Sequence, residues 1–469
     1  PGSLLAGLLL ATGGLSFATV FMFRHLPGWF AQIYFAYQPS PGGWFAVQFL
    51  FGMLVMFPAT FAFGGIFPAV LQYHARGLDQ VAGSVGTVYT ANTVGTIAGA
   101  AVAGFVLIPA LGVQDSVVLV AGSQMVLGAV ALAALSGIAR SPRTIAVAGA
   151  LVVAVAFPFV RPGWDALLMN SGVYMNLQDL PEGSDWDDFL EVVRDDNELV
   201  YAREGMTASV LVADQPSIGN RYLAVNGKIE ASTNADMETQ LMIAHLPLLL
   251  HDDPKDILVI GLASAITVGG AATQPIETIR VVEVEEAMIP AAHLFADDNG
   301  GVMDDPRLEL SINDARNELE FSSSSYDVII SEPSNPWMTV ASNLFTEDFF
   351  RLAGRRLRDD GIFAQWVQNY YLPAEDLQSI LSAFHSAFPN VLVFETFEGV
   401  DLLLLGTRDR LALDLDRIAS RMSELEVRMD LARVDVREPN DVLPLFVLGP
   451  REVDRMVEGA PRNTDDNAR

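Results

Sequence analysis

The sequence predicts a chain in two unlike parts, a multi-helix transmembrane domain over residues 1–160 and a later α/β domain with a doubly wound sheet. Three observations support this prediction. Residues 1–160 hold only two of the 57 acids and four of the 28 bases. Apolar stretches of about 20 residues, the length needed to cross a bilayer, recur in the same region. From residue 256 onward, short apolar runs alternate with helix-compatible segments, which is typical of a largely parallel sheet.

Charge limits the partners that the chain can have. The 469 residues are 51% hydrophobic and carry a formal charge of −29, almost all of it after residue 160. Such a surface repels phosphate backbones, which argues against nucleic acid as a partner. Cationic substrates, or a salt-rich setting, fit it better. The chain has no cysteine, so there is no disulfide framework.

Five stretches in the first part are long and apolar enough to cross a bilayer. They cover approximately residues 4–23, 44–71, 88–108, 116–138 and 144–160. Pro58 and Pro68 predict a kinked or broken second helix. Because the chain opens on Pro1, directly before an apolar stretch, we expect further helices upstream. No ionisable residue lies deep within the five stretches, which argues against ion-coupled transport by this part.

The third stretch contains the motif YTANTVGTIAGAAVAG. Gly95 and Gly99 lie four residues apart, with Asn92 one turn earlier. Small residues at this spacing let helices approach closely, and an amide inside a membrane needs an interhelical partner. We therefore favour a packing role over a transport site.

The basic residues give a weak prediction of membrane orientation. Arg76, Arg140 and Arg143 fall on one side of the predicted helices, whereas Arg24, Arg161 and the soluble part fall on the other. The positive-inside rule therefore leans toward an external soluble domain. The margin is three against two, and upstream helices would change it.

The middle of the chain predicts a linker and then a small β-rich region. Residues 161–199 are a linker with a short amphipathic helix near residues 186–193. Residues 200–255 are predicted to form a β-hairpin and helix subdomain. VYAREGMTASVLVAD and RYLAVNGKIEAS read as a β-hairpin and a further strand, and the second run turns at Asn226-Gly227, a pair favoured in type I′ turns. A helix follows over residues 237–250. His245 and His251 lie six apart and match no metal-binding spacing, so both are predicted to be structural and no zinc site is expected.

Residues 256–411 predict the α/β domain, and its first unit is the best candidate for a nucleotide site. The segment DILVIGLASAITVGGAATQPIETIRVVEVE combines a strand, a small-residue turn, a helix and a second strand. Gly261 and Glu283 are separated by 22 positions, close to the roughly 20 expected of a nucleotide-binding unit. The alternative is an ordinary crossover that binds no ligand. The predicted strands are residues 257–260, 279–284, 308–312, 328–331, 361–366, 391–395 and 402–405.

Acids follow three of these strands, namely Glu283, Asp314 and Glu332. The carboxyl ends of neighbouring parallel strands meet at one crevice, so we expect the three acids to converge there. Residues 412–469 are predicted to form a helical and loop-rich tail, with an amphipathic helix over DLDRIASRMSELEVRM.

Several blocks, in order, resemble the spermidine synthase (polyamine aminopropyltransferase) family over about residues 200–407. They are LAVNGKIEAST, AHLPLLLH before KDILVIG, VVEVEE, DDPRLEL followed by Asp314, YDVIISEPSNP, LFTEDFF and GIFAQWVQNYYL. The membrane motif YTANTVGTIAG and the terminal NTDDNAR resemble the membrane-fused, transporter-like members of that family. Chains of that subfamily run on past the NTDD block, so we expect both ends here to be cut.

The resemblance implies a Rossmann-like (class I methyltransferase-like) fold that binds an S-adenosyl donor, either S-adenosylmethionine or its decarboxylated form, without metal. It implies that Glu283 holds the ribose, Asp314 the adenine amino group, and Glu332 the acceptor amine as base or anchor. The remaining donor-binding residues implied are Gln240, Gly261 and Ser264. The remaining substrate-binding residues implied are Asp236, Asn335, Gln365 and Tyr370.

The chain departs from the family pattern at two places. Ala263 and Ala265 stand in the glycine-rich loop, where a left-handed conformation costs alanine about 1 kcal/mol. Ser264 replaces an aspartate and has no charge with which to hold the donor amine. In the gate, residues 332–336 (Glu-Pro-Ser-Asn-Pro), Asn335 replaces a second carboxylate. We therefore expect donor and acceptor to be held less tightly.

These observations leave alternative functions open. The first is a membrane-anchored transferase that aminopropylates an amine or polyamine. The second is a catalytically degenerate domain that acts as a scaffold, a sensor or a subunit of a membrane complex. A third is a transporter-like membrane part regulated by its soluble domain. The expected location is a prokaryotic inner or plasma membrane, with a cytoplasmic soluble domain if the enzyme is active, and a homodimer is a further option.

Overall fold

The computed structural model describes residues 1–74, 81–135, 137–177, 180–181, 183–338, 341–411 and 413–467. The chain divides into two compact units, Pro1–Leu211 with Val225–Lys228, and Val212–Ala224 with Ile229–Arg469. The five-part division expected from the sequence is finer than this and stays a prediction. Arg76 and Asp79 of the charge counts, Ala412 at the start of the predicted tail, and the last two residues of NTDDNAR lie outside the described residues.

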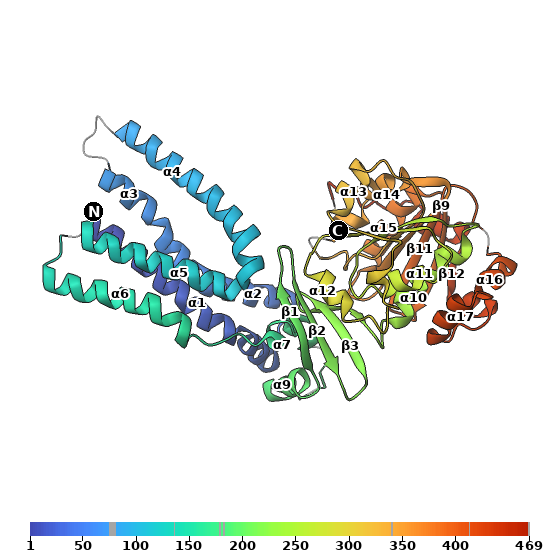
Figure 1. The fold of residues 1–469 in the computed structure, drawn as a ribbon, viewed down its shortest axis with the longest axis horizontal. Coiled ribbons are helices and arrows are strands. Elements are labelled where there is room, and N and C mark those ends of the chain that lie inside the picture. The colour runs from blue at the N-terminus through green and yellow to red at the C-terminus, as the bar shows by residue number, and fades with distance from the viewer. Residues whose placement is uncertain are drawn as a thin grey trace. The chain divides into compact units, whose positions relative to one another are not determined.

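The first unit is built mainly of long apolar helices (Figure 1). They are α1 (Gly2–Tyr37), α2 (Pro41–Gly64), α3 (Ile66–His74), α4 (Val81–Val102), the π-helical turn η2 (Ala103–Leu107), α5 (Ile108–Leu135) and α6 (Arg140–Val160). Within the described residues, four helical segments are long and apolar enough to cross a membrane: Gly2–Tyr37, Gly42–His74, Ala82–Leu135 and Arg140–Val160.

The third of these segments, Ala82–Leu135, contains two of the five predicted stretches. An unbroken helix of its 54 residues would be about 80 Å long, more than twice the thickness of a bilayer core. Gly112 interrupts it with the non-helical angles φ 79° and ψ 169°, and Figure 1 shows α4 and α5 running in opposite directions. The segment therefore provides two helices of membrane length.

The predicted break in the second helix is confirmed, because α2 ends at Gly64 and α3 begins at Ile66. The predicted close packing around Gly95 and Gly99 is not seen among the described residues. A Cβ atom placed on either glycine would meet nothing within 4 Å. Packing in this unit instead joins α1, α5 and α6, where the rings of Phe17 and Phe157 stack with centroids 3.9 Å apart.

Short elements follow the helices. They are α7 (Ala166–Met169), α8 (Val173–Asn176), α9 (Trp186–Arg194), β1 (Glu198–Glu204), β2 (Ser209–Gln215), β3 (Asn220–Val225) and β4 (Lys228–Ser232). Helix α9 is the predicted amphipathic helix, and a capping box of Asp185 and Asp188 begins it. The strands form a sheet in the order β1-β2-β3-β4. The turn at Asn226 (φ 51°) and Gly227 (φ 85°) has the left-handed angles that a type I′ turn needs.

The second unit contains an eight-stranded mixed sheet in the order β12-β10-β11-β9-β8-β5-β6-β7. Its strands are β5 (Asp256–Ile260), β6 (Thr278–Glu283), β7 (Leu308–Ile312), β8 (Tyr326–Ser331), β9 (Leu357–Gln368), β10 (Asn390–Phe397), β11 (Asp401–Thr407) and β12 (Phe446–Leu448). Strands β5 to β9 pair in parallel, whereas β10 pairs antiparallel with β11 and β12, and β11 with β9. All seven predicted strands are present. The strand β12 was not predicted because its three residues carry too short a pattern.

Helices cover both faces of this sheet, which explains why its central strands are apolar on both sides. Helix α10 (Met237–Leu250), predicted with these bounds, packs on β8 to β11, and α11 (Ile266–Ala272) packs on α10. The other face packs against α13 (Ala315–Phe321), α14 (Glu347–Gly354), α15 (Ala374–Ala387) and α18 (Pro450–Val457) around Phe350, Phe363 and Phe384. The remaining elements are α12 (Met288–His293) and the 3₁₀ turns η4 (Val302–Asp304), η5 (Ser342–Phe345), η6 (Ala432–Val434) and η7 (Pro439–Leu445).

The tail is more ordered than predicted. The single amphipathic helix expected from residue 414 is two helices, α16 (Leu415–Met422) and α17 (Leu425–Leu431). Helix α17 holds Asp430, whose Oδ2 lies 2.8 Å from Nε2 of the fully buried His245 on α10. Burial disfavours the Asp430 charge, but hydrogen bonds from His245 and Arg433 hold the pKa of Asp430 below its usual value. His245 therefore has a structural role, as predicted.

Candidate active site

The loop between β5 and α11 lies at the carboxyl edge of the sheet, next to the end of β8. Gly261 takes φ 100°, which side chains rarely adopt. A Cβ atom there would lie 2.7 Å from the carbonyl oxygen of Glu332. Only glycine fits this position, because the two strand ends approach each other so closely.

The two alanines of this loop have the strained conformation that the sequence suggested. Ala263 has φ 43° and Ala265 has φ 60°. A left-handed conformation costs each alanine about 1–2 kcal/mol relative to its preferred region. The loop keeps the backbone path of a glycine-rich turn but carries two methyl groups.

Glu283 ends β6 and is anchored by backbone amides. Its Oε2 accepts from the N–H of Leu262 at 3.0 Å, and its Oε1 accepts from the N–H of Glu285 at 2.8 Å. Burial raises the pKa of Glu283, and these hydrogen bonds oppose the rise. Each carboxylate oxygen can accept a second hydrogen bond, so the group retains capacity for ribose hydroxyls.

Asp314 lies beyond the end of the neighbouring strand, β7. Glu283 pairs with Ile312 in the ladder between β6 and β7, and the N–H of Asn313 donates to the carbonyl of Glu283 at 2.9 Å. Asp314 itself is exposed and caps α13, accepting from the N–H of Asn317 at 3.0 Å. The two acids therefore stand on adjacent strand ends, joined through the backbone.

Gln240 and Ser264 are brought together, but they bind each other. The Ser264 hydroxyl donates to Oε1 of Gln240 at 2.6 Å, and Nε2 of Gln240 donates to the carbonyl of Ser232 at 2.8 Å. Both side chains are buried. Their contacts hold α10 against the loop, and the donor contacts expected of them stay a prediction.

Glu332 follows β8 and begins the gate. Its Oε2 accepts from the Thr267 hydroxyl at 2.7 Å. Burial raises the pKa of Glu332 to about 7; the Thr267 hydrogen bond acts in the opposite direction, and the charges of Asp401, Asp236 and Glu230 add to the rise. A carboxylate with this pKa exchanges a proton at neutral pH.

The acids around Glu332 come from separate elements. Asp236 precedes α10, and its N–H donates to Oγ of Ser232 at 3.1 Å. Asp401, at the start of β11, accepts from Oγ1 of Thr239 at 2.8 Å and from Nε1 of Trp366 at 3.0 Å. Glu230 accepts from the hydroxyl of Ser334 in the gate. This concentration of negative charge favours binding of a cation.

Buried amides near the gate have unused hydrogen-bonding capacity. Within the described part of the chain, Oδ1 of Asn335, Oε1 of Gln365 and both polar atoms of Gln368 have no partner, although all three residues are fully buried. Nδ2 of Asn335 donates to the Tyr370 hydroxyl at 3.4 Å, and Nε2 of Gln365 donates to the carbonyl of Trp366 at 3.0 Å. Unpaired buried polar atoms are costly, so their presence at one sheet edge points to an absent ligand or water.

Sequence reasoning missed four residues of this region, namely Thr267, Glu230, Asp401 and Gln368. Thr267 lies on a helix with no distinguishing pattern around it. Glu230 and Asp401 lie 102 and 69 residues from Glu332, so only the fold brings their charges near it. Gln368 was part of the quoted block GIFAQWVQNYYL, and its buried position was the missing information.

One cluster of metal-ligand residue types is present among the described residues. Ligand atoms of His251, Asp327 and Asp360 lie within 4.8 Å of one another. However, Nδ1 of His251 accepts from the N–H of Asp253, so its Nε2 carries the hydrogen. Asp327 already binds the N–H groups of Lys255 and Asp256 and the Arg358 guanidinium. The cluster is therefore poorly suited to a metal ion.

Comparison with known proteins shows which family this part of the chain resembles. A sequence model of the family described as "Spermine/spermidine synthase domain" matches residues 237–397. These residues are a spermidine synthase domain. The match includes Gln240, the loop after β5, Glu283, Asp314 and the gate. The resemblance to the spermidine synthase family is therefore confirmed, whereas membership of the membrane-fused subfamily stays a prediction.

The spermidine synthase domain has curated relatives of modest similarity. The polyamine aminopropyltransferase of Bacillus subtilis (strain 168) is 24% identical over 259 residues, which cover 54% of this chain and 91% of that protein. The spermidine synthase of Schizosaccharomyces pombe is 27% identical over 198 residues, which cover 41% of this chain and 64% of that protein.

Solved structures of spermidine synthases are also similar to this chain. One in complex with the transition state analogue AdoDATO has a TM-score of 0.48 and 20% identity, and covers 55% of this chain and 88% of its own. The spermidine synthase from Thermotoga maritima has a TM-score of 0.46 and 20% identity, and covers 55% and 87%.

Proposed function

We propose that the spermidine synthase domain transfers an aminopropyl or related alkyl group from an S-adenosyl donor to an amine. The observation that carries this proposal is Glu332, a carboxylate with a pKa near 7 among further acids, at the end of the strand beside the nucleotide loop. S-Adenosylmethionine and its decarboxylated form are the two donor candidates. A polyamine or another amine is the proposed acceptor.

The chemistry explains why a carboxylate is needed. An alkyl amine is an ammonium ion at neutral pH and has no lone pair for attack. Glu332 would accept one proton from it. The amine lone pair would then form a bond to the carbon beside the sulfonium, while the carbon–sulfur bond breaks and its electrons remain on sulfur. The leaving thioether nucleoside is neutral, so positive charge passes from the donor to the product amine.

The donor would lie along the carboxyl edge formed by β5, β6 and β7. Glu283 is proposed to hold the ribose, with Asp314 at the adenine and the loop of Gly261 and Ser264 beneath the sulfonium side. The acceptor would lie between the gate and β9, where Asp236, Asn335, Gln365 and Tyr370 are the proposed contacts. Orientation of both substrates is a large part of catalysis in such a site.

A second function is favoured by two observations. Ser264 and Gln240 hydrogen-bond each other, and two strained alanines occupy the loop. A domain that has lost donor binding would tolerate these features, and it would then act as a scaffold, a sensor or a subunit of a membrane complex. The long apolar helices support anchoring in a lipid bilayer in either case. If the domain is active, it is proposed to face the cytoplasm, where S-adenosyl donors are found.

Titration calorimetry on the 469-residue chain in detergent separates the two functions. S-Adenosylmethionine, decarboxylated S-adenosylmethionine and methylthioadenosine would be tested in turn. The transferase function predicts saturable heat with at least one of them, and loss of that heat in Glu283→Gln. An absence of heat with all three compounds, in protein that melts cooperatively, would leave the scaffold function.

Glu332→Gln then tests the assigned role. We expect it to lower turnover by about 10²–10⁴-fold while methylthioadenosine still binds, because Glu332 contacts the acceptor and not the nucleoside. Glu375→Gln, an exposed acid at the start of α15, is the matched control and should change neither quantity. Equal loss of nucleoside binding and turnover in Glu332→Gln would remove its role as base.

A further inference from the structure

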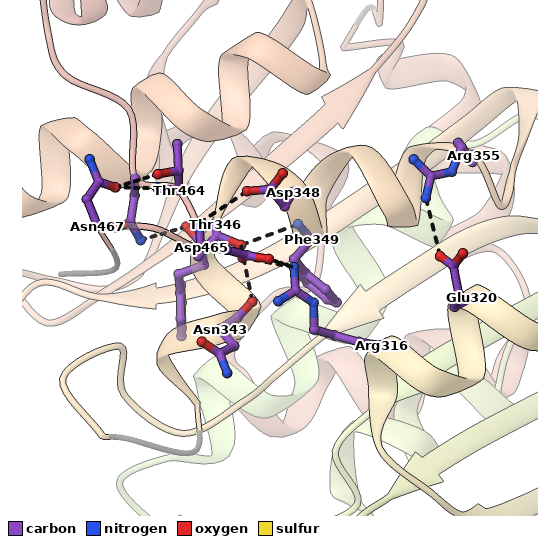
Figure 2. A network of polar contacts seen from close by, with 12 residues as sticks. Arg316, Glu320, Asn343, Thr346, Asp348, Phe349, Arg355, Thr464, Asp465 and Asn467 are labelled. Atoms are coloured by element: carbon purple, nitrogen blue, oxygen red, sulfur yellow. Dashed lines mark hydrogen bonds and ion pairs between the residues drawn. The ribbon is translucent and has the colours of Figure 1, made fainter.

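The terminal block Asn463-Thr464-Asp465-Asp466 is docked on the domain by a network of polar contacts (Figure 2). Asn463 is fully buried. Its Nδ2 donates to the carbonyl of Phe345 at 3.0 Å, its N–H donates to the carbonyl of Ser379 at 3.2 Å, and its carbonyl accepts from the N–H of Glu347 at 2.8 Å. The block therefore joins η5, α14 and α15.

Asp465 extends this network to a third helix, α13. Its carboxylate accepts from Arg316 at 2.9–3.0 Å and from the Thr346 hydroxyl at 2.7 Å, and its N–H donates to Asp348 at 3.1 Å. Figure 2 shows Arg316 and Thr346 converging on this one carboxylate. Partial burial acts against the charge, but hydrogen bonds from Arg316 and Thr346 hold the pKa of Asp465 below its usual value.

The two groups that meet at Asp465 each follow a part of the proposed active site. Arg316 lies two residues after Asp314, the proposed adenine contact, on the helix that Asp314 caps. Thr346 caps α14 and directly follows η5, the first element after the gate. A change in the distance between α13 and α14 would therefore change the distance between donor and acceptor sides.

We propose that Asp465 is a positioning residue that fixes the donor side of the site relative to the gate. This inference rests on the proposed transferase function and adds a role for a block outside the proposed contact residues. A contribution to folding stability does not by itself explain why Asp465 pairs with Arg316. The carboxylate is 44% exposed, and an exposed ion pair adds little to folding free energy. Its effect is instead to set the position of two helices that bear site residues.

The test compares Asp465→Asn with Asp466→Asn in the 469-residue chain in detergent. Both changes remove one negative charge, and the neighbouring Asp466 is exposed. Methylthioadenosine affinity, the KM for donor, kcat and Tm would be measured for each. We expect Asp465→Asn to weaken methylthioadenosine binding and raise the donor KM by about 3–10-fold, with Tm nearly unchanged. Asp466→Asn should match the wild type in all four quantities.

A double-mutant cycle with Arg316→Gln identifies the partner. If the ion pair does the positioning, Arg316→Gln and the double variant should show the same rise in donor KM as Asp465→Asn alone. The positioning role would be overturned if the wild type binds methylthioadenosine and Asp465→Asn has the same affinity and donor KM as the wild type. The transferase function would not be affected by that result. A wild type that binds none of the nucleosides would overturn the transferase function, and this inference with it.

Discussion

The hydroxyl of Thr267 lies 2.7 Å from Oε2 of Glu332, so the helix after the nucleotide loop directly contacts the proposed base. This contact links the donor half of the site to the acceptor half through one hydrogen bond. A hydroxyl donor stabilises the charged form of a carboxylate, which opposes the effect of burial on Glu332.

Removal of this hydrogen bond should shift the pH dependence of the reaction. In Thr267→Val we expect the apparent pKa of kcat/KM to rise by about half a unit to one unit, because burial would act on Glu332 unopposed. Activity should fall about 2–10-fold at pH 7 and recover at pH 9. Thr273→Val is the control, since the Thr273 hydroxyl donates to the carbonyl of Gly270 near the other end of α11. Equal shifts in both variants would contradict the assignment.

The raised pKa of Glu332 also predicts a pH dependence of stability. The folded state holds the Glu332 proton with a pKa of about 7, above the ordinary glutamate value of 4.5. The contribution of Glu332 to the free energy of unfolding is therefore greatest below pH 4.5. It is lost as the pH rises through 7, and the loss is about 3 kcal/mol at most. Denaturation of the wild type and Glu332→Gln at pH 5 and pH 8 checks the sign. The variant should lose less stability than the wild type over this interval.

Gln368 provides a test for the acceptor pocket. Both of its polar side-chain atoms are buried without a partner among the described residues. We expect Gln368→Leu to stabilise the ligand-free protein by about 1–2 kcal/mol, and to raise the KM of the amine about 10-fold with donor affinity unchanged. Gln378→Leu is the contrast, because the amide of Gln378 donates to the carbonyl of Met456 and should lose that bond. An unchanged amine KM in Gln368→Leu would place the acceptor elsewhere.

The strained loop predicts a stabilising substitution. Ala265→Gly relieves a left-handed alanine at φ 60° and should raise stability by about 1 kcal/mol. It also removes a methyl group beside the proposed donor, so methylthioadenosine should bind more tightly. Ala271→Gly in the last turn of α11 is the control, because Ala271 is helical, with an expected loss of up to about 1 kcal/mol. Destabilisation by both changes would show that Ala265 is not strained.

The sequence alone determined the order and type of most elements. Strand runs such as DILVI and YDVII are rich in apolar and β-branched residues, as expected of strands that are buried on both faces. The Asn226-Gly227 turn depends only on local backbone preference. The resemblance to a glycine-rich loop pointed to Ala263 and Ala265 as strained positions, and both have positive φ angles. Predictions were wrong or incomplete where the local pattern is weak. The break between α16 and α17 and the strand β12 were not predicted.

The tertiary structure alone decided which side chains meet. Glu332 has a pKa near 7 because the surrounding protein excludes water and, as a smaller effect, because Asp401, Asp236 and Glu230 bring negative charge from three other elements. Gln240 and Ser264, both expected to contact the donor, also hydrogen-bond each other because α10 packs against the loop and α11, and their donor contacts stay a prediction. Charge interaction and desolvation depend on distance in space, and distance along the chain does not encode them.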